Sequence, residues 1–261
     1  MSDVTESPNR LNRLKDLWGA GKASFGAIVT IPSIQVIQIL AHAGFDWFII
    51  DMEHGPIDLP SAHAMIVATA DTSAVPFVRV SWTIPRLAKT VLDVGALGIC
   101  YPMIRSRAEA EVAARSVRYP PDGERLWGPF YAPLRWNLPT VAYMHAANKE
   151  VLAIITIEHL DAVRKIDEIA STPGVDLAFI GPGDLATSLG HYGEPDHPEV
   201  QAAMAEAEAG ILRSKVLLGG VARSPEQANQ MIERGYRALV LGFDWSLLQR
   251  GAATALQGLN R

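Results

Sequence analysis

The sequence predicts a single (β/α)₈ barrel, on three observations. Short apolar runs rich in β-branched residues alternate with longer segments whose apolar residues recur every three or four positions, which is typical of βα units around a parallel sheet. Eight such runs occur, and the 261 residues match the roughly 250 that this fold occupies. No low-complexity linker divides the chain, so we predict one domain over 1–261, with 1–10 as a flexible tail. A six-stranded doubly wound sheet is the alternative.

The eight predicted strands are short apolar runs. In chain order they span 25–31, 47–51, 76–80, 98–103, 152–157, 177–180, 216–221 and 238–241. Helical periodicity between them predicts helices over 34–42, 59–71, 85–94, 108–116, 160–171, 201–213 and 225–235. Ser33 and Ser224 are predicted helix starts, and Gly44, Gly95 and Gly235 are predicted stops.

Three further segments lie outside this repeat. Residues 11–19 predict an N-terminal helix that caps the bottom of the barrel, and 246–259 predict a terminal helix. The stretch 119–149 is interpreted as an elongated loop after the fourth strand, with an extra helix at about 138–148. Long loops in compact domains are usually functional, so a lid and an oligomer contact both remain open for it.

Composition excludes several classes of protein. With 49% hydrophobic residues and a net charge of −5, neither disorder nor nucleic-acid binding is expected. The single cysteine, Cys100, lies in an apolar run, where a buried inert thiol is favoured over a nucleophile. Residues 1–10 lack an apolar signal region, and no stretch approaches the roughly 18 apolar residues that cross a bilayer. We therefore expect a cytoplasmic protein without a membrane partner.

Polar residues follow several predicted strands, and parallel strands of a barrel bring their carboxyl ends to one mouth. Glu158 and Asp184 follow the fifth and sixth strands, and together they offer hard oxygen ligands for a divalent cation. Solvated loop acids are the alternative interpretation of either residue alone. Their shared placement after adjacent strands favours the metal site.

A glycine-rich turn, Gly181-Pro182-Gly183, precedes Asp184 and opens a helical segment. Backbone N–H groups at such a turn, together with the positive end of the helix, can hold the carboxylate of a small acid. Glycines of this kind also occur where a tight βα connection alone needs them. Adjacency to Asp184 is what favours a binding role.

His54 and Arg79 are the candidate catalytic side chains. His54 follows Asp51 and Glu53 at a strand exit, where an imidazole beside carboxylates suits general acid/base catalysis, although a structural histidine is an equal alternative. Arg79 ends an apolar strand and could stabilise a developing enolate oxygen, or form an ion pair with Asp51 or Glu53. No lysine ends an apolar strand, so a Schiff base is not expected. Ranked below His54 are His42, His63, His145, His159, His191 and His197.

Seven motifs, in order and at compatible spacing over about 26–248, resemble the HpcH/HpaI family of metal-dependent (class II) pyruvate aldolases. That family acts on 4-hydroxy-2-oxoheptanedioate and 2-keto-3-deoxy sugar acids. The motifs are Gly44-Phe45-Asp46-Trp47 through Asp51-Met52-Glu53-His54, Val78-Arg79-Val80, Val91-Leu92-Asp93-Val94-Gly95-Ala96, Pro102-Met103, Arg118-Tyr119-Pro120-Pro121, Ile157-Glu158, and Phe179-Ile180 through Gly183-Asp184-Leu185.

The resemblance implies the chemistry and the assembly. It implies a divalent metal, Mg²⁺ or Mn²⁺ before Co²⁺ or Zn²⁺, held by Glu158 and Asp184 and chelated by the 2-oxo acid. A 4-hydroxy-2-oxo acid is then cleaved reversibly, through a metal-stabilised enolate, to pyruvate or hydroxypyruvate and an aldehyde. It assigns the family's histidine to His54, its arginine to Arg79, and its supporting aspartates to Asp51 and Asp93. The counterpart of Asp93 acts across a subunit boundary, in hexamers that are trimers of dimers with exchanged C-terminal helices.

Two departures from the family affect the choice of substrate. Thr156 stands where the family often has Gln, and Arg125-Leu126-Trp127-Gly128 replaces Arg-Gly-x-Gly. We therefore count Thr156, Trp127 and Val221 as candidate substrate-contacting residues, with Ile28 and Trp82 as further lining residues, although ordinary packing can explain the apolar ones.

Two other functions remain as alternatives. A lyase or decarboxylase of oxaloacetate-like acids would use the same site, and would release pyruvate without an aldehyde. A non-catalytic protein that binds 2-oxo acids would keep the metal pocket, but it has little need for a base beside the chelated acid.

Overall fold

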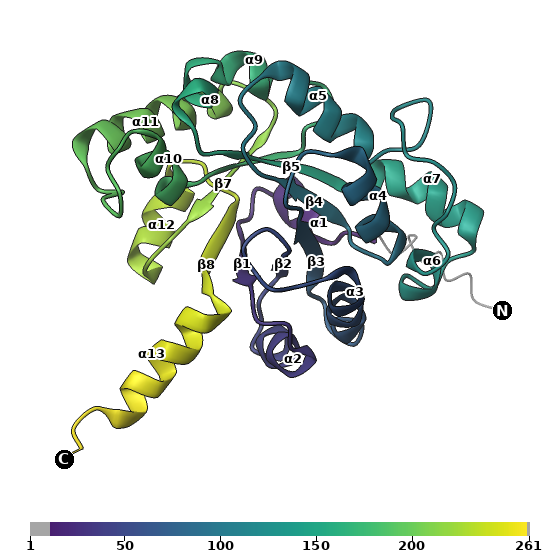
Figure 1. The fold of residues 1–261 in the computed structure, drawn as a ribbon, viewed down its shortest axis with the longest axis horizontal. Helices are drawn as coiled ribbons and strands as arrows, with labels where there is room; N and C mark the ends of the chain where they lie inside the picture. Colours follow the sequence, from purple (N-terminus) through teal and green to yellow (C-terminus); the bar gives the residue numbers. More distant parts are fainter. Residues whose placement is uncertain (1–10, 260–261) are drawn as a thin grey trace.

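The computed structural model describes residues 11–259, and its core is a closed barrel of eight parallel strands (Figure 1). Each strand pairs with its neighbours in chain order, and β1 closes the barrel against β8. The predicted (β/α)₈ fold is confirmed, and the six-stranded alternative is wrong because the sheet has no free edge. The strands are β1 (Ser24–Val29), β2 (Trp47–Asp51), β3 (Val75–Arg79), β4 (Gly98–Tyr101), β5 (Leu152–Ile157), β6 (Leu177–Ile180), β7 (Leu217–Val221) and β8 (Ala238–Phe243).

Aromatic side chains pack against one another inside the barrel. Every residue of β2 to β6 is buried, as expected for strands covered on both faces. Inside, the Trp47 ring centroid lies 5.9 Å from that of Phe77 and 5.7 Å from that of Phe179. Gly26 leaves the room for this layer, since a Cβ there would lie 2.1 Å from the Trp47 ring. The interior of the barrel is therefore a packed core at this level.

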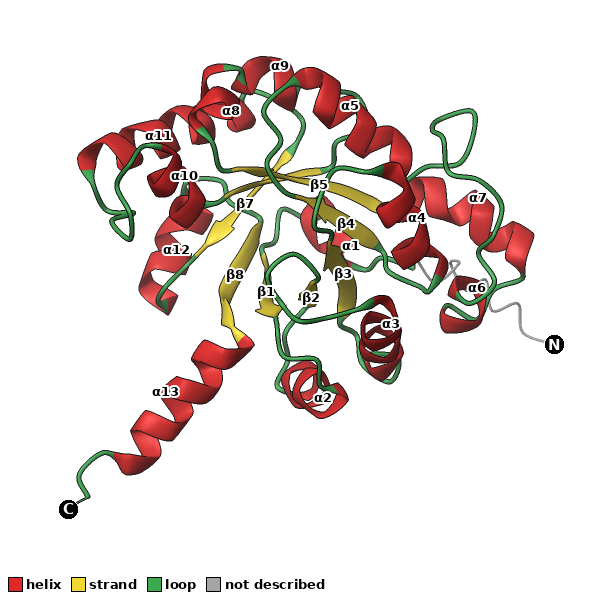
Figure 2. Ribbon diagram, in the orientation of Figure 1, coloured by secondary structure: helices red, strands yellow, loops and turns green. Residues whose placement is uncertain are grey.

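Helices cover the outside of the barrel between the strands (Figure 2). Ser33 and Ser224 cap their helices by accepting from the third following N–H, and Gly44, Gly95 and Gly235 follow helix ends with positive φ, as predicted. The predicted helix at 160–171 is divided at Lys165. The helices are α2 (Ile34–His42), α3 (Leu59–Ala68), α4 (Pro85–Asp93), α5 (Arg107–Ser116), α8 (Leu160–Arg164), α9 (Ile166–Ala170), α10 (Pro182–Ser188), α11 (Pro198–Leu212) and α12 (Pro225–Glu233).

The N-terminal helix α1 (Leu14–Gly19) closes the amino-terminal end of the barrel, as predicted. Trp18 is buried, and its Nε1 donates to Ser24 Oγ and to the Arg237 carbonyl, both at 3.0 Å. Ser24 begins β1 and Arg237 precedes β8, so these bonds hold α1 across the strand starts. The tail predicted for 1–10 lies outside the described residues.

The long insertion 119–149 lies between the fourth and fifth strands, as expected, and it follows the helix α5. Its position after a helix places it at the amino-terminal end of the barrel. It contains α6 (Ala132–Arg135) and α7 (Thr140–Glu150), of which the predicted helix at 138–148 anticipated the second. Trp136 Nε1 donates to the Gly95 carbonyl at 3.0 Å, which fixes α6 beside the end of α4.

The last helix, α13 (Asp244–Leu256), projects away from the barrel (Figure 1). Its first residue, Asp244, is buried and accepts hydrogen bonds from Thr30 N and Ile31 N at 3.0 and 2.8 Å. Beyond it the helix is largely exposed, including Trp245 and Leu248. Exchange of this helix between subunits stays a prediction. Within residues 11–259, no helix is long and apolar enough to cross a membrane.

Candidate active site

A cavity of about 220 Å³ lies at the carboxyl ends of the strands. We call it the mouth cavity. All eight strands or their following loops contribute to its walls, which are apolar apart from Arg79, Thr156, Glu158, Asp184 and the Cys100 thiol. The predicted metal ligands Glu158 and Asp184 therefore converge with Arg79 and Thr156 at one end of the fold.

Glu158 and Asp184 face this cavity from adjacent units. Glu158 follows β5 and Asp184 lies in the first turn of α10 after β6, and Ile157 pairs with Ile180 in the sheet. Glu158 is only 4% exposed, and its Oε1 accepts from Met103 N at 2.5 Å. Burial raises the pKa of Glu158 above its usual range, and the negative charge of Asp184 raises it further.

This pair of carboxylates fits a divalent cation. Two like charges in a buried cavity repel one another, and a cation between them removes that repulsion and replaces the lost hydration. Their donor atoms are hard oxygens, which suit Mg²⁺ or Mn²⁺, and two protein ligands leave positions for a substrate. The metal site predicted from the sequence is thus physically consistent with the side chains present.

Arg79 is held by two carboxylates at the end of β3. Its Nε and Nη2 donate to the two oxygens of Asp51 at 2.9 and 2.6 Å, and Glu53 Oε2 lies 3.3 Å from Nε. Burial alone would lower the pKa of Arg79, but its bonds to Asp51 and the nearby negative charges raise it. Arg79 Nη1 has no hydrogen-bond acceptor within residues 11–259. The ion pair considered as an alternative therefore exists, and it leaves one N–H₂ group of a fixed cation available to the cavity.

His54 and Glu53 lie on the turn that follows β2. Asp51 Oδ1 accepts from the backbone N–H groups of Glu53 and His54 at 3.1 and 3.3 Å, which shapes the turn. The His54 side chain is 63% exposed and does not line the mouth cavity, and its Nε2 lies 3.7 Å from Glu53 Oε2. The His54 imidazole and the Arg79 guanidinium therefore lie beside the same carboxylate, that of Glu53.

Glu53 is the site residue that sequence reasoning missed. Burial raises the pKa of Glu53 to about 7, helped by the charges of Glu158 and Asp51 and opposed by Arg79 and His54. A carboxyl group that titrates near neutrality is suited to proton transfer. Its place between Asp51 and His54, just after a strand, could have indicated a role for Glu53. The sequence alone does not show which of several neighbouring acidic residues is buried.

The predicted substrate-contacting residues on β5, β6 and β7 line the mouth cavity. Thr156 Oγ1 donates to the Tyr101 carbonyl at 2.7 Å, and Val221 lies on β7, two strands further round the barrel. In the glycine-rich turn, the Gly181 N–H already donates to Ile157 O at 3.0 Å. Since proline has no N–H, the N–H groups left for a ligand are those of Gly183 and Asp184.

Two of the predicted residues, Asp93 and Trp127, lie away from the end of the barrel that holds the mouth cavity of their own chain. Asp93 ends α4, at the amino-terminal end of the barrel, where it pairs with buried Arg125 at 2.9 Å. Trp127 is 58% exposed in the neighbouring loop, and a Cβ on Gly128 would lie 3.2 Å from Asp93 Oδ2. Asp93 and Trp127 therefore lie near one another and away from the metal ligands.

Cys100 behaves as the sequence indicated. The thiol is 2% exposed in the cavity wall, and burial raises its pKa to about 12, so it stays protonated at neutral pH. Of the other proposed lining residues, Ile28 faces the mouth cavity. Trp82 faces a separate cavity of about 240 Å³ beside α5.

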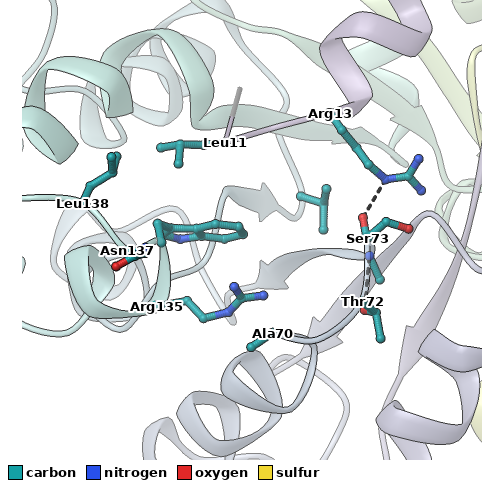
Figure 3. A pocket seen from close by; sticks show the side chains of 11 residues that line it. Leu11, Arg13, Ala70, Thr72, Ser73, Arg135, Asn137 and Leu138 are labelled. Atoms are coloured by element: carbon teal, nitrogen blue, oxygen red, sulfur yellow. Dashed lines mark hydrogen bonds between the residues drawn. The ribbon is translucent and has the colours of Figure 1, made fainter. Parts of the chain in front are cut away.

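A larger cavity, about 740 Å³, lies at the opposite end of the barrel (Figure 3). It is bounded by Leu11 and Arg13, by 70–75, and by 135–138. Its two arginines already have partners: Arg13 Nε donates to Ser73 O at 2.6 Å, and Arg135 Nε donates to Ile66 O at 3.2 Å. It contains none of the predicted catalytic groups, so its size does not make it the active site.

Comparisons with known proteins agree with this geometry. The family model described as HpcH/HpaI aldolase/citrate lyase matches residues 29–250. The chain is 38% identical to a 4-hydroxy-2-oxo-heptane-1,7-dioate aldolase of Klebsiella pneumoniae, over 92% of this chain and 91% of that protein. It is 36% identical to a hydroxypyruvate/pyruvate aldolase of Pseudomonas aeruginosa, over 92% and 90%. The crystal structure of an HpcH/HpaI aldolase/citrate lyase family protein from Burkholderia cenocepacia is 36% identical, with a TM-score of 0.84 over 94% and 96%.

Proposed function

The chain belongs to the HpcH/HpaI aldolase/citrate lyase family, and on this premise we propose that it is a class II aldolase of 4-hydroxy-2-oxo acids. It cleaves them reversibly to pyruvate, or a related 2-oxo acid such as hydroxypyruvate, and an aldehyde. The observation that carries the proposal is the convergence of Glu158, Asp184 and the fixed Arg79 on one small cavity. The names of the relatives support both donors, since one is an aldolase of hydroxypyruvate and pyruvate.

Glu158 and Asp184 hold the metal in this proposal, with Mg²⁺ or Mn²⁺ as the preferred ion because both ligands are carboxylate oxygens. A bound divalent cation would polarise the keto group of the substrate and so ease cleavage of the neighbouring carbon–carbon bond. The free N–H groups of Gly183 and Asp184 orient the substrate carboxylate.

The chain's own groups handle charge and protons. His54, assisted by the Glu53 carboxylate, accepts the proton of the C4 hydroxyl as the C3–C4 bond breaks and the aldehyde forms. The bonding electrons move into the former keto group, whose oxygen becomes negative. Arg79 Nη1 stabilises that oxygen, and Asp51 keeps the guanidinium in place. A proton returned to C3 completes the 2-oxo acid product.

The mouth cavity also limits the substrate. Its volume of about 220 Å³ suits a small acid, and its walls at Ile28, Val221 and Phe243 are apolar. Thr156 presents a short hydroxyl that is already bonded to a carbonyl, so it offers the substrate less polar contact than a longer amide would.

The assembly we propose is a homohexamer in which Asp93 and Trp127 serve the active site of a neighbouring copy. Supporting this is their shared position away from their own cavity, beside a stretch of exposed apolar side chains that forms a surface. That surface includes Leu126, Phe130 and Leu134, and such patches mark interfaces. The exposed α13 would supply the helix exchanged between subunits, and a cytoplasmic location fits the charge and the single buried cysteine.

Mixing two inactive variants tests the shared site. Asp93→Asn and Glu158→Gln are each expected to be inactive, but subunits exchanged between them form some sites with both groups intact. Random mixing should restore about a quarter of wild-type activity, since half of the chains carry Glu158 and half of their neighbours carry Asp93. No recovery after verified subunit exchange contradicts a shared site.

Metal removal tests the reaction itself. Untagged protein is treated with EDTA and assayed for cleavage of a 4-hydroxy-2-oxo acid, with pyruvate and aldehyde measured separately. We expect activity to vanish and to return with Mg²⁺ or Mn²⁺, but not in Glu158→Gln. Asp167→Asn, at an exposed ion pair, is the matched control and should behave like wild type. Activity that survives chelation, or pyruvate released without aldehyde, contradicts the proposal.

His54→Ala separates an enzyme from a binding protein. Unchanged binding of pyruvate with lost turnover supports the enzyme. A parent protein that binds 2-oxo acids but turns over none of a panel of aldehyde and donor pairs would instead be a binding protein.

A further inference from the structure

Two histidines and a glutamate form a second cluster of metal-ligating side chains, apart from the mouth cavity. His191 and His197 lie in the connection between α10 and α11, and Glu199 lies in the first turn of α11. One ligand atom from each lies within 4.8 Å of the others. None of the three lines the mouth cavity.

The three side chains of this cluster contact one another directly. The two imidazole rings are stacked, with centroids 3.5 Å apart and planes at 18°. His191 Nε2 lies 2.9 Å from Glu199 Oε2, and His197 Nδ1 accepts from the Glu199 N–H at 3.3 Å. The hydrogen bond from His191 lowers the pKa of Glu199.

The ligand types select a different ion from the one proposed for the mouth cavity. Two imidazole nitrogens and one carboxylate oxygen are a common protein set for Zn²⁺ and similar transition ions, and leave one position for water. Mg²⁺ favours sites made of oxygen alone. We propose that His191, His197 and Glu199 bind a transition-metal ion of the Zn²⁺ class, at a site separate from Glu158 and Asp184.

Metal binding requires two local adjustments, and a partly exposed cluster can make both. Stacked rings point their nitrogens in parallel, so one ring must turn before both can reach a single ion. The hydrogen bond from the Glu199 N–H to His197 Nδ1 is also lost. If Nδ1 binds the metal, it can no longer accept this bond; if Nε2 binds the metal, Nδ1 carries the ring proton and cannot accept either. That bond is long and lies at the surface, so metal ligation can outweigh its loss.

A metal here would connect α11 to the helix that carries Asp184. The backbone N–H of His191 donates to Ala186 O in α10, the helix that carries Asp184, at 2.9 Å. His197 and Glu199 belong to the start of α11. An ion held by all three would fasten the end of α10 to α11 and raise the thermal stability of the protein.

The test counts zinc ions bound per chain by equilibrium dialysis of untagged protein. In a Glu158→Gln/Asp184→Asn background, which lacks the proposed catalytic ligands, we expect one Zn²⁺ per chain and a higher melting temperature on its addition. Adding His197→Asn should abolish both effects, because Asn still caps α11 but is a poor metal ligand. His145→Gln, at an exposed histidine of α7, is the matched control and should retain the ion.

Co²⁺ supplies a second readout in otherwise unaltered protein, should the background variant fail to fold. Visible absorption typical of four- or five-coordinate Co²⁺ should appear in wild type and weaken in His197→Asn, with a loss of affinity of more than about tenfold. Cleavage activity with Mg²⁺ should be equal in the two. No zinc in the background variant, or equal binding with and without His197, overturns the proposal.

Discussion

Removing the charge of Asp51 tests whether the buried ion pair organises the active site. Asp51→Asn keeps an oxygen that can accept from the turn N–H groups, but loses the negative charge and the 2.6 Å bond to Arg79 Nη2. The Asp51 side chain is fully buried and that of Arg79 is 10% exposed, so the guanidinium cannot recover its bond from water. Breaking such a pair costs about 3–5 kcal/mol. Glu53, 3.3 Å from Arg79 Nε, compensates in part, so we expect about 3 kcal/mol.

Denaturant unfolding at one fixed protein concentration measures this cost. Asp167→Asn is a control matched in distance, since Arg213 Nη2 also lies 2.6 Å from Asp167 Oδ1, but both side chains there are more than half exposed. It should cost at most about 1 kcal/mol. In the cleavage assay, Asp51→Asn should lower kcat/KM about 100- to 1000-fold, the loss typical for a misplaced charge-stabilising donor.

A double variant separates stability from catalysis. Asp51→Leu/Arg79→Met replaces the pair with apolar side chains, and should recover most of the lost stability without recovering activity. If Asp51→Asn matched Asp167→Asn in stability, or kept its activity, the ion pair would not be the organising contact that we describe.

Three further predictions concern other groups. The pKa of Glu53 is raised to about 7, so its contribution to stability is present at low pH and is lost as the pH rises through 7. The metal-free variant Glu53→Gln resembles the protonated form, so its stability relative to wild type should increase from pH 5 to pH 8. Denaturant unfolding at these two pH values would contradict this if it showed no relative increase. Gly26→Ala should destabilise the protein by about 1–3 kcal/mol, because the added Cβ would clash with Trp47, whose Nε1 donates to Ser24 Oγ. The control Gly19→Ala adds a Cβ that would meet nothing within 4 Å, so it should be neutral or stabilising in the same unfolding measurement. Cys100, with its pKa raised to about 12, should resist iodoacetamide at pH 8 in the native protein and react after unfolding, as mass spectrometry would show; rapid native labelling would refute the described burial.

Most of the fold could be predicted because its periodicities are strong. The runs at 47–51, 152–157 and 177–180 have the bounds of β2, β5 and β6, since every residue in them is buried and apolar or at a strand end. The insertion 119–149 was predicted between the fourth and fifth strands, where it lies, but the end of the barrel that it occupies follows only from its position after α5. Figure 1 shows its helices α6 and α7 on the same side of the barrel as α4.

The candidate site was predicted in part, for a physical reason. Residues at strand ends, such as Glu158 and Arg79, are brought together by the barrel itself, so their convergence follows from the fold. Glu53 and His54 share the same turn, but only packing decides that Glu53 is largely buried while His54 is 63% exposed. The position of Asp93 at the far end of α4 likewise depends on the length of that helix, and the role proposed for it requires a neighbouring copy.

Binding of Mn²⁺, followed by the loss of the free-ion signal in electron paramagnetic resonance, tests the central claim most directly. In a His197→Asn background, one Mn²⁺ should bind per chain, and pyruvate should tighten it by about 5- to 150-fold because both share the ion. Glu158→Gln and Asp184→Asn should each lose the binding and the effect of pyruvate. Unchanged Mn²⁺ affinity in either variant, or an affinity indifferent to pyruvate, would contradict a cation held jointly by the protein and the 2-oxo acid.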